Sequence, residues 1–248
     1  MSEVSTIYVP GIASLPLRVF GDAAAASRAG AEFIADEARQ AVAERGRFVM
    51  AASGGTTPYE MYRQLAAQDL PWPKLHVVQV DERMVPPGNK DRSLRLLEET
   101  LVELGELAPR CLHPMPADSP YPEPAMRFYS TVLSDLAGTP PVLDVVHLGL
   151  GADGHTGSLV PGDAALDVKD RDVVSTAGPY RGTRRMTLTY PILNRARAIL
   201  WLVTGGAKAE MLGRLLEGDA RIPAGRIHRE RAVVFADEAA GGRFRHGL

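Results

Sequence analysis

LDVVHLGLG, residues Leu143–Gly151, is an almost unbroken run of apolar residues that ends in two closely spaced glycines. A strand with one solvent-facing side would alternate apolar and polar residues, whereas this run is apolar at nearly every position. Such a run is typical of a strand covered on both faces, as the strands of a parallel sheet are. We therefore predict a buried strand here, in a mainly parallel sheet.

Four further runs of the same kind occur along the chain: Arg47–Ser53, Leu75–Glu82, Ala198–Gly206 and Ala232–Asp237. Segments with a helical spacing of apolar residues lie between the strands: Asp22–Arg45, Thr57–Gln68, Ser93–Leu104, Glu123–Leu136 and Ala207–Gly218. One of these segments starts with Thr and Pro, which are good residues for a helix start. Alternation of strand and helix predicts an α/β fold, with a mainly parallel sheet wrapped by helices.

The length and composition are those of a globular protein. The chain has 248 residues, of which 45% are hydrophobic and 23% charged, so a sizeable core can form. None of its proline-rich stretches is long enough to be an obvious domain linker, and we expect one domain over residues 1–248. The formal net charge of −2 gives no sign of a general attraction to nucleic acid or to an anionic membrane. An anionic ligand would have to be bound by local cations.

The cysteine count and the N-terminus bear on the compartment. The sequence contains one cysteine, Cys111, so an internal disulfide cannot form and a reducing compartment is favoured. Met1–Leu15 lacks a charged start followed by a long apolar run, so we expect no signal peptide. No apolar run is long enough to span a bilayer. These features predict a cytoplasmic protein without a membrane partner.

Ligands of parallel sheets gather beyond the carboxyl ends of the strands, so the residues at those ends are site candidates. Glycines, hydroxyls, acids, a histidine and cations occur at four of the five predicted strand ends. They are Ser53, Gly54, Gly55 and Thr56 at the first end, Asp81 and Arg83 at the second, Asp153 and His155 at the third, and Lys208 at the fourth. Each signal is weak alone, but together at one edge of a sheet they predict a site.

Two of these strand ends could hold an anion. In ASGGTTP, Ala52–Pro58, glycines let the backbone approach a ligand, and free N–H groups at a helix start attract negative charge. The segment is not a Walker loop, and the alternative is a tight turn capped by a threonine. Lys208 in a first helical turn opposes the helix dipole, which a bound anion would offset. The alternative there is a solvated surface lysine.

VDERM places Asp81, Glu82 and Arg83 at the end of a buried strand. These charges could form a structural ion pair. They could instead place an acid or a guanidinium over the sheet edge, where the planar fork of arginine suits a phosphate or carboxylate.

The loop GLGADGHTGS, Gly149–Ser158, fits the G-x-G-x-x-G spacing of dinucleotide-binding loops. That motif needs a helix that runs on from the glycines, and Pro161-Gly162 interrupts one, so we expect no dinucleotide. His155 is instead the candidate base, since an imidazole can take a proton from water at neutral pH; the alternative is a capping or packing histidine. A metal on Asp153 and His155 would lack a clear third ligand, and Ser158 has no G-x-S-x-G elbow to make it a nucleophile.

Four blocks of the sequence together resemble the 6-phosphogluconolactonases. They are ASGGTTPYEMYRQL, VDERMVPP, LGLGADGHTGSLVPG and RRMTLTYPILNRARAILWLVTGGAKAEML, and the resemblance runs from about Asp22 to the C-terminus. Glucosamine-6-phosphate deaminases look similar, but they have D-E-Y where this chain has Asp81-Glu82-Arg83. Their D-G-H loop also leads to an F-N-E-P segment, where this chain has Thr156-Gly157-Ser158-Leu159-Val160-Pro161. The blocks therefore favour a lactonase over a deaminase.

The chain departs from the lactonase pattern at two places. The serine-asparagine pair that often follows VPP is represented by Ser93 alone. The proline- and lysine-rich segment that commonly precedes R-x-T-L-T is replaced by AGPYRGTRRMTLT. Arg185 nevertheless holds the cation position two residues before Thr187, and Arg184 is a neighbour that could substitute.

The resemblance implies hydrolysis of 6-phospho-D-glucono-1,5-lactone to 6-phosphogluconate, in the oxidative pentose phosphate pathway. It implies a Rossmann-like fold of the glucosamine-6-phosphate deaminase/ribose-5-phosphate isomerase type. The expected catalytic residues are His155 as the base that activates water, Arg83 as the oxyanion donor, and Asp153 or Asp81 as the residue that orients the base or the water. The expected substrate- and phosphate-binding residues are Ser53, Gly54, Gly55, Thr56, Arg185 and Lys208.

The resemblance also bears on cofactors and partners. Opening a lactone requires no metal or organic cofactor, and the partner implied is a small-molecule sugar-phosphate lactone; no oligomeric state is implied. Two alternatives stay open at this point. One is a deaminase or isomerase that uses Asp81 as its base, and the other is a non-catalytic sugar-phosphate sensor.

Overall fold

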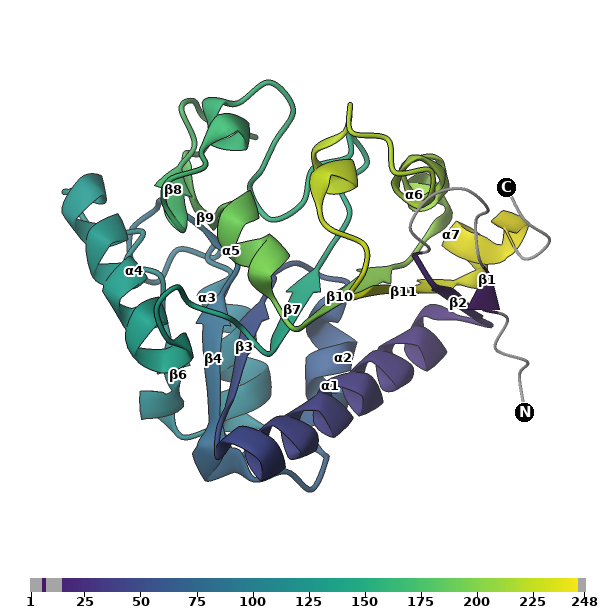
Figure 1. The fold of residues 1–248 in the computed structure, drawn as a ribbon, viewed down its shortest axis with the longest axis horizontal. Helices are drawn as coiled ribbons and strands as arrows, with labels where there is room; N and C mark the ends of the chain where they lie inside the picture. Colours follow the sequence, from purple (N-terminus) through teal and green to yellow (C-terminus); the bar gives the residue numbers. More distant parts are fainter. Residues whose placement is uncertain (1–5, 8–14, 245–248) are drawn as a thin grey trace.

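The computed structural model describes residues 6–7 and 15–244. Met1–Leu15, the segment in which no signal peptide is expected, lies almost entirely outside these ranges. An eight-stranded sheet runs through the molecule in the order β1-β2-β11-β10-β7-β3-β4-β6 (Figure 1). Its strands are β1 Thr6–Ile7, β2 Leu17–Phe20, β11 Ala232–Asp237, β10 Ala198–Val203, β7 Val145–Leu148, β3 Phe48–Ala52, β4 Leu75–Gln79 and β6 Leu112–His113.

The five strands predicted from apolar runs lie side by side in this sheet and pair in parallel. β7 occupies the middle, where Val146 is in register with Ile199 of β10 on one side and with Ala51 of β3 on the other. All residues of β3, β7 and β10 are buried, which explains their unbroken apolar sequences. The predicted α/β fold with a mainly parallel sheet is confirmed.

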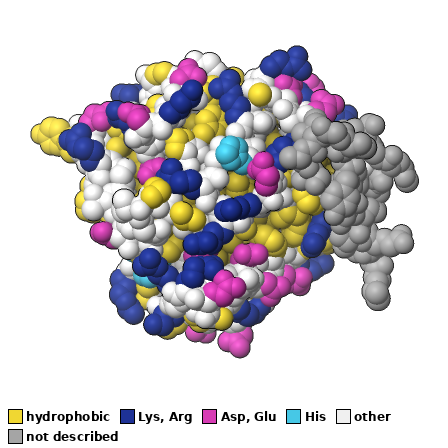
Figure 2. All heavy atoms as spheres, viewed as in Figure 1, with side chains coloured by type: hydrophobic (Ala, Val, Ile, Leu, Met, Phe, Trp, Pro, Cys, Tyr) yellow, Lys and Arg dark blue, Asp and Glu magenta, His cyan; other side chains and the backbone are white. Residues whose placement is uncertain are grey.

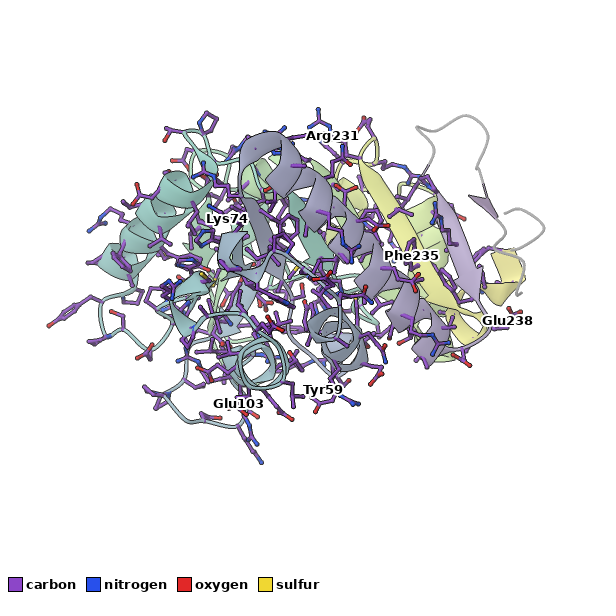
Figure 3. All side chains as sticks on the ribbon, turned by 90° about the horizontal axis from the view of Figure 1, so that it is seen from below. Tyr59, Lys74, Glu103, Arg231, Phe235 and Glu238 are labelled. Carbon is purple, nitrogen blue, oxygen red and sulfur yellow. The ribbon has the colours of Figure 1, made fainter. Side chains whose placement is uncertain are left out.

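Helices cover both faces of the sheet (Figure 1). On one face, Phe235 of β11, which is labelled in Figure 3, packs edge-on against Phe33 with ring centroids 5.9 Å apart. The helices of this layer are α1 Ala23–Arg45 and α2 Pro58–Ala66. The helices that bury apolar side chains on the opposite face are α4 Pro122–Ala137, α5 Tyr190–Arg195 and α6 Ala209–Leu216. Because helices cover both faces, the loops at the ends of the strands are left to form a site.

α1 begins and ends where the sequence predicts. The Asp22 carboxylate accepts a hydrogen bond from the Ala25 N–H at 2.7 Å and so caps the first turn. At the other end Gly46 has a φ of 76°, and its N–H donates to the Val42 carbonyl at 2.9 Å. A side chain at position 46 would strain this left-handed conformation, so glycine fixes the end of the helix.

Two predicted helices differ from regular α-helices at their ends. Ser93–Leu104 forms the short helix α3, Leu94–Leu97, followed directly by a π-helix over Glu98–Glu103. The 3₁₀ turn Gly206–Lys208 precedes α6, so Lys208 lies just before the α-helix and not within its first turn. The last helix, α7, is Glu238–Gly241. No helix within the described ranges is long and apolar enough to cross a membrane.

The predicted strand Leu75–Glu82 is wrong at its C-terminal end. β4 ends at Gln79, and the next residues enter a second sheet with the order β5-β9-β8. β5 and β9 are antiparallel, and Arg83 lies opposite Arg185. The Leu188 N–H donates to the Val80 carbonyl at 2.8 Å, which anchors this sheet where β4 ends. The three strands are β5 Asp81–Arg83, β9 Arg185–Leu188 and β8 Val173–Ser175.

Candidate active site

A cavity of about 260 Å³ lies at the carboxyl ends of β3, β7 and β10, beside the second sheet. On the face shown in Figure 2, lysine and arginine side chains gather around a histidine near the middle of the view. The structure brings nine of the ten sequence-predicted site residues to the cavity wall, and the tenth, Asp153, contacts one of them. The nine are Ser53, Gly54, Gly55, Thr56, Asp81, Arg83, His155, Arg185 and Lys208.

The loop between β3 and α2 is built for close approach of a ligand. Gly55 has a φ of 109°, and a Cβ on Gly54 would lie 2.4 Å from Ser93 Oγ, so neither position accepts a larger residue without a shift. Thr57 precedes α2 but makes no side-chain cap hydrogen bond within the described structure. The threonine cap, which was the alternative to an anion site, is therefore not formed by Thr57, and its side chain does not occupy the N–H groups at the start of α2.

Ser53 has a supporting place in this loop. Its hydroxyl donates to the His147 carbonyl at 2.8 Å, and the side chain is buried. The Ser53 hydroxyl proton is thus already donated to the His147 carbonyl. The next residues, Gly54, Gly55 and Thr56, line the cavity wall. Ser53 holds the loop against β7 in this arrangement.

Asp153 and His155 are in direct contact. Asp153 Oδ1 lies 2.5 Å from His155 Nδ1, and the imidazole is 20% exposed beside the cavity. Burial alone would raise the pKa of Asp153, but hydrogen bonds from His155 and then Tyr180 outweigh it and lower that pKa to about 2. Asp153 therefore stays ionised and can hold Nδ1–H, which leaves Nε2 of the ring as the proton acceptor.

Glycines make this contact possible. A Cβ on Gly151 would lie 1.9 Å from His155 Nδ1, in the space that the ring occupies. Gly154, between Asp153 and His155, has a φ of 83° and packs against Ile222, 2.7 Å from where its Cβ would be. Gly151 and Gly154 thus allow the histidine to fold back onto the aspartate.

Asp81 lies away from the imidazole. Its carboxylate accepts a hydrogen bond from Ser158 Oγ at 2.6 Å and is 3.9 Å from the Arg185 guanidinium. Ser158 is fully buried, and its hydroxyl is directed to Asp81 and not to His155. Asp153, and not Asp81, is therefore the acid that contacts His155, and no serine–histidine pair is formed by Ser158.

Arg83 is held by the turn that precedes α3. Its Nη1 donates to the Asp91 carbonyl and to Ser93 Oγ, both at 2.9 Å. Glu82, which is fully buried, accepts the backbone N–H groups of Ser93 and Leu94 at 2.7 and 2.8 Å and so fixes that turn. Of the three charges in the segment 81–83, Glu82 is the structural one.

Arg185 is a buried cation with a hydrogen-bond donor that is unsatisfied within the described part of the chain. It is 8% exposed, and its Nε has no hydrogen-bond partner within the described residues. Burial, followed by the nearby charge of Arg83, lowers its pKa. The neighbouring Arg184 instead donates to the Thr176 carbonyl and the Ser175 hydroxyl, outside the cavity, so it does not substitute for Arg185.

Lys208 reaches the cavity from the loop after β10. Gly205 turns that loop with a φ of 90°, and its N–H lies 3.0 Å from both carboxylate oxygens of Asp237. Burial, and then the charge of Arg181, lowers the pKa of Lys208. Lys208 is thus a partly buried cation on the cavity wall and not a fully solvated surface lysine.

Sequence reasoning missed three residues near the cavity. His147 and Arg181 line it, and Tyr180 contacts Asp153. His147 is 1% exposed, its Nδ1 lies 2.9 Å from Tyr62 OH, and burial lowers its pKa to about 3. A histidine inside the apolar run LDVVHLGLG was the available signal for it. Tyr180 and Arg181 lie in AGPYRGTRR, where the chain departs from the resembled pattern.

The loop after Gly154 does not take the dinucleotide-binding form. It continues through a bridge between Thr156 and Leu159 into the 3₁₀ turn Ala164–Asp167, so no α-helix runs on from the glycines in this described segment. Within residues 6–7 and 15–244, no three His, Cys, Asp or Glu side chains are grouped so that they could hold a metal ion.

Comparison of the sequence with known proteins identifies a family. The sequence profile of glucosamine-6-phosphate isomerases/6-phosphogluconolactonase matches residues 21–235. A 6-phosphogluconolactonase of Synechocystis is 37% identical over 214 residues, which cover 83% of this chain and 88% of that protein.

Solved structures share the fold. A 6-phosphogluconolactonase from Thermotoga maritima superposes with a TM-score of 0.79 at 26% identity, over 89% of this chain and 98% of that one. A monomeric glucosamine-6-phosphate deaminase superposes with a TM-score of 0.78, over 91% of this chain and 98% of that one. Its 21% identity shows the fold alone. The expected Rossmann-like fold of the deaminase type is confirmed.

Proposed function

This chain belongs to the glucosamine-6-phosphate isomerase/6-phosphogluconolactonase family, and on that basis we propose that it hydrolyses 6-phospho-D-glucono-1,5-lactone to 6-phosphogluconate. The observation that carries the proposal is the contact of Asp153 with His155 beside a cavity that also holds Arg83, Arg185 and Lys208. A phosphorylated lactone needs a base to activate water and cations to bind its phosphate, and this cavity offers both.

The phosphate binds where open N–H groups and cations converge. The loop Gly54–Thr56 supplies backbone donors, and Arg185 and Lys208 supply positive charge. Arg185 has a buried Nε without a partner among the described residues, and a phosphate oxygen would satisfy it. Charge-assisted contacts of this kind hold a phosphate dianion and orient the rest of the sugar.

His155 acts as the general base. Its Nε2 takes a proton from water while the water oxygen forms a bond to the lactone carbonyl carbon, and Asp153 stabilises the resulting imidazolium. When the tetrahedral intermediate collapses, the bond from that carbon to the ring oxygen breaks, and the ring oxygen takes the proton from His155. The base is thereby regenerated, and the carboxylic acid formed releases a proton to water.

Arg83 stabilises the oxyanion that forms on the carbonyl oxygen. Its guanidinium is fixed by Asp91 and Ser93, so little reorganisation is required when the negative charge develops. Arg83 also lies opposite Arg185 across the second sheet, so one ligand can contact both.

A proton-release assay on freshly made 6-phosphogluconolactone tests the proposal, with the rate corrected for spontaneous hydrolysis. We expect release of one proton per lactone at a rate proportional to the protein concentration, and no release of ammonia from glucosamine 6-phosphate. Ammonia release would instead assign the deaminase reaction. Binding of 6-phosphogluconate without turnover of the lactone would assign a sensor.

A further inference from the structure

Tyr180 is held in a tight turn between β8 and β9, in the segment where the chain departs from the lactonase pattern. The Tyr180 N–H donates to the Thr183 carbonyl at 2.9 Å, and the intervening Arg181 and Gly182 have φ values of 51° and 87°. Positive φ at both central residues is the mark of a hairpin turn that matches the twist of the flanking chain. Before the turn, the Asp163 carboxylate accepts the Ala177 N–H at 3.0 Å. The position of Tyr180 is therefore set from both sides.

The hydroxyl of Tyr180 reaches the catalytic pair. It donates to Asp153 Oδ2 at 2.8 Å and lies 3.2 Å from His155 Nδ1. Since Asp153 Oδ1 is taken by His155, the tyrosine occupies the other carboxylate oxygen. Two donors on two oxygens fix the plane of the carboxylate, and through it the orientation of the imidazole. The Tyr180 and His155 rings also pack edge to face, with centroids 5.2 Å apart.

The ring of Tyr180 meets the cations of the cavity. The Arg185 guanidinium carbon lies 5.2 Å from the ring centroid, and that of Arg181 lies 5.3 Å from it. Both distances allow cation–π attraction. The Tyr180 side chain therefore contacts Asp153 and His155 through its hydroxyl, and the phosphate-binding Arg185 through its ring.

We propose that Tyr180 is a positioning residue for the hydrolysis proposed above: its hydroxyl aligns Asp153 with His155, and its ring holds Arg185 against the phosphate. The inference rests on the proposed function. It assigns a role to a residue in the segment AGPYRGTRR, which replaces the usual proline- and lysine-rich segment.

The two roles are separable by substitution. Tyr180→Phe keeps the ring and removes the hydroxyl, so KM stays near that of the wild type while kcat falls about tenfold, the factor expected for one lost hydrogen bond to a charged group. Tyr180→Leu also removes the ring, so KM rises as well. Tyr121→Phe is the matched control, because Tyr121 is 70% exposed on the surface before α4.

An NMR measurement at one fixed pH provides a readout that does not depend on turnover. The ¹⁵N chemical shifts of the His155 ring report which ring nitrogen carries the proton, and Asp153 holds that proton at Nδ1. In Tyr180→Phe the Asp153 carboxylate loses the donor on its second oxygen and is less firmly aligned with the ring. We therefore expect the His155 ring signals to move in Tyr180→Phe and to stay in place in Tyr121→Phe.

The experiment measures kcat, KM and the ¹⁵N chemical shifts of the His155 ring in the wild type and the three variants. A lower kcat with unchanged KM in Tyr180→Phe, together with moved ring signals, supports the inference. Wild-type kcat and unmoved ring signals in Tyr180→Phe overturn it, whether or not Tyr180→Leu folds. If the wild type has no lactonase activity, the proposed function fails, and the NMR signals still decide whether Tyr180 acts on His155 through Asp153.

Discussion

Arg83 and Arg185 lie directly opposite each other in the antiparallel pairing of β5 with β9, and both line one cavity. Like charges in opposite positions destabilise a sheet, and here one of the two guanidinium groups is also buried. The Asp81 carboxylate, 3.9 Å from Arg185, compensates only in part. A phosphate bound to Arg185 would offset part of the remaining repulsion, so the arrangement favours a site that is completed by an anionic ligand.

Removal of either phosphate-binding cation should weaken substrate binding more than it slows the chemistry. We expect Arg185→Ala and Lys208→Ala each to lose about 1.5–3 kcal/mol of binding, seen as a KM raised roughly 10- to 150-fold with a smaller change in kcat. Arg184→Ala is the control, because Arg184 bonds to Thr176 and Ser175. Steady-state kinetics decide the matter, and an unchanged KM in both variants would refute the phosphate assignment.

Glycine at position 151 should be required for the contact of His155 with Asp153. In Gly151→Ala the new methyl group would fall 1.9 Å from His155 Nδ1, so the ring cannot close onto Asp153 and turnover should fall at least tenfold. Gly21→Ala is the matched control, since Gly21 does not line the cavity and no described atom lies within 4 Å of where that Cβ would be. Similar rates in the two variants would show that the close approach of ring and backbone is unimportant.

His147 should make the protein less stable in mild acid. Burial lowers its pKa from 6.5 to about 3, so between these values the unfolded chain binds a proton that the folded protein does not. Stability is therefore lost as the pH falls below 6.5, by about 2 kcal/mol between pH 7 and pH 5 from this group alone.

The variant His147→Leu isolates this effect. Tyr62 keeps a partner there, because its hydroxyl also donates to the Ser53 carbonyl at 3.0 Å. Urea unfolding at pH 7, 6 and 5 should show the free energy of unfolding falling less steeply in the variant than in the wild type. Parallel pH dependence in the two proteins would mean that His147 is not kept neutral by burial.

Long apolar runs and periodic helices made most of the main sheet predictable. The second sheet was not, because β5, β8 and β9 are three- or four-residue strands, and LHVVQVDE contains no glycine or proline to mark the break after Gln79. The pairing of β5 with β9 joins positions about a hundred residues apart in the sequence, such as Asp81 with Thr187. Propensity within a short window carries no such information.

Site residues were predictable where they come soon after a strand, and less so where their place depends on contacts between loops. Gly54, His155 and Lys208 each follow a recognisable strand, so their convergence could be expected from the topology. The sequence alone does not tell which of the adjacent charged residues Glu82 and Arg83 faces the cavity. The turn before α3 decides it, because Glu82 binds the backbone of that turn while Arg83 lines the cavity. Tyr180 lies in a turn without periodicity, so nothing in the sequence placed its hydroxyl on Asp153.

The most direct test of the account compares turnover with product binding in His155→Asn. The substitution removes the proton acceptor and leaves the cations of the cavity in place, so the variant should fold normally and bind 6-phosphogluconate as the wild type does. Its turnover of fresh lactone should fall by about 10²–10⁴, the usual contribution of a general base. Lost turnover with retained product binding is the predicted result. Near-normal turnover would contradict the account, since His155 would then be structural and Asp81 would become the leading candidate for the base.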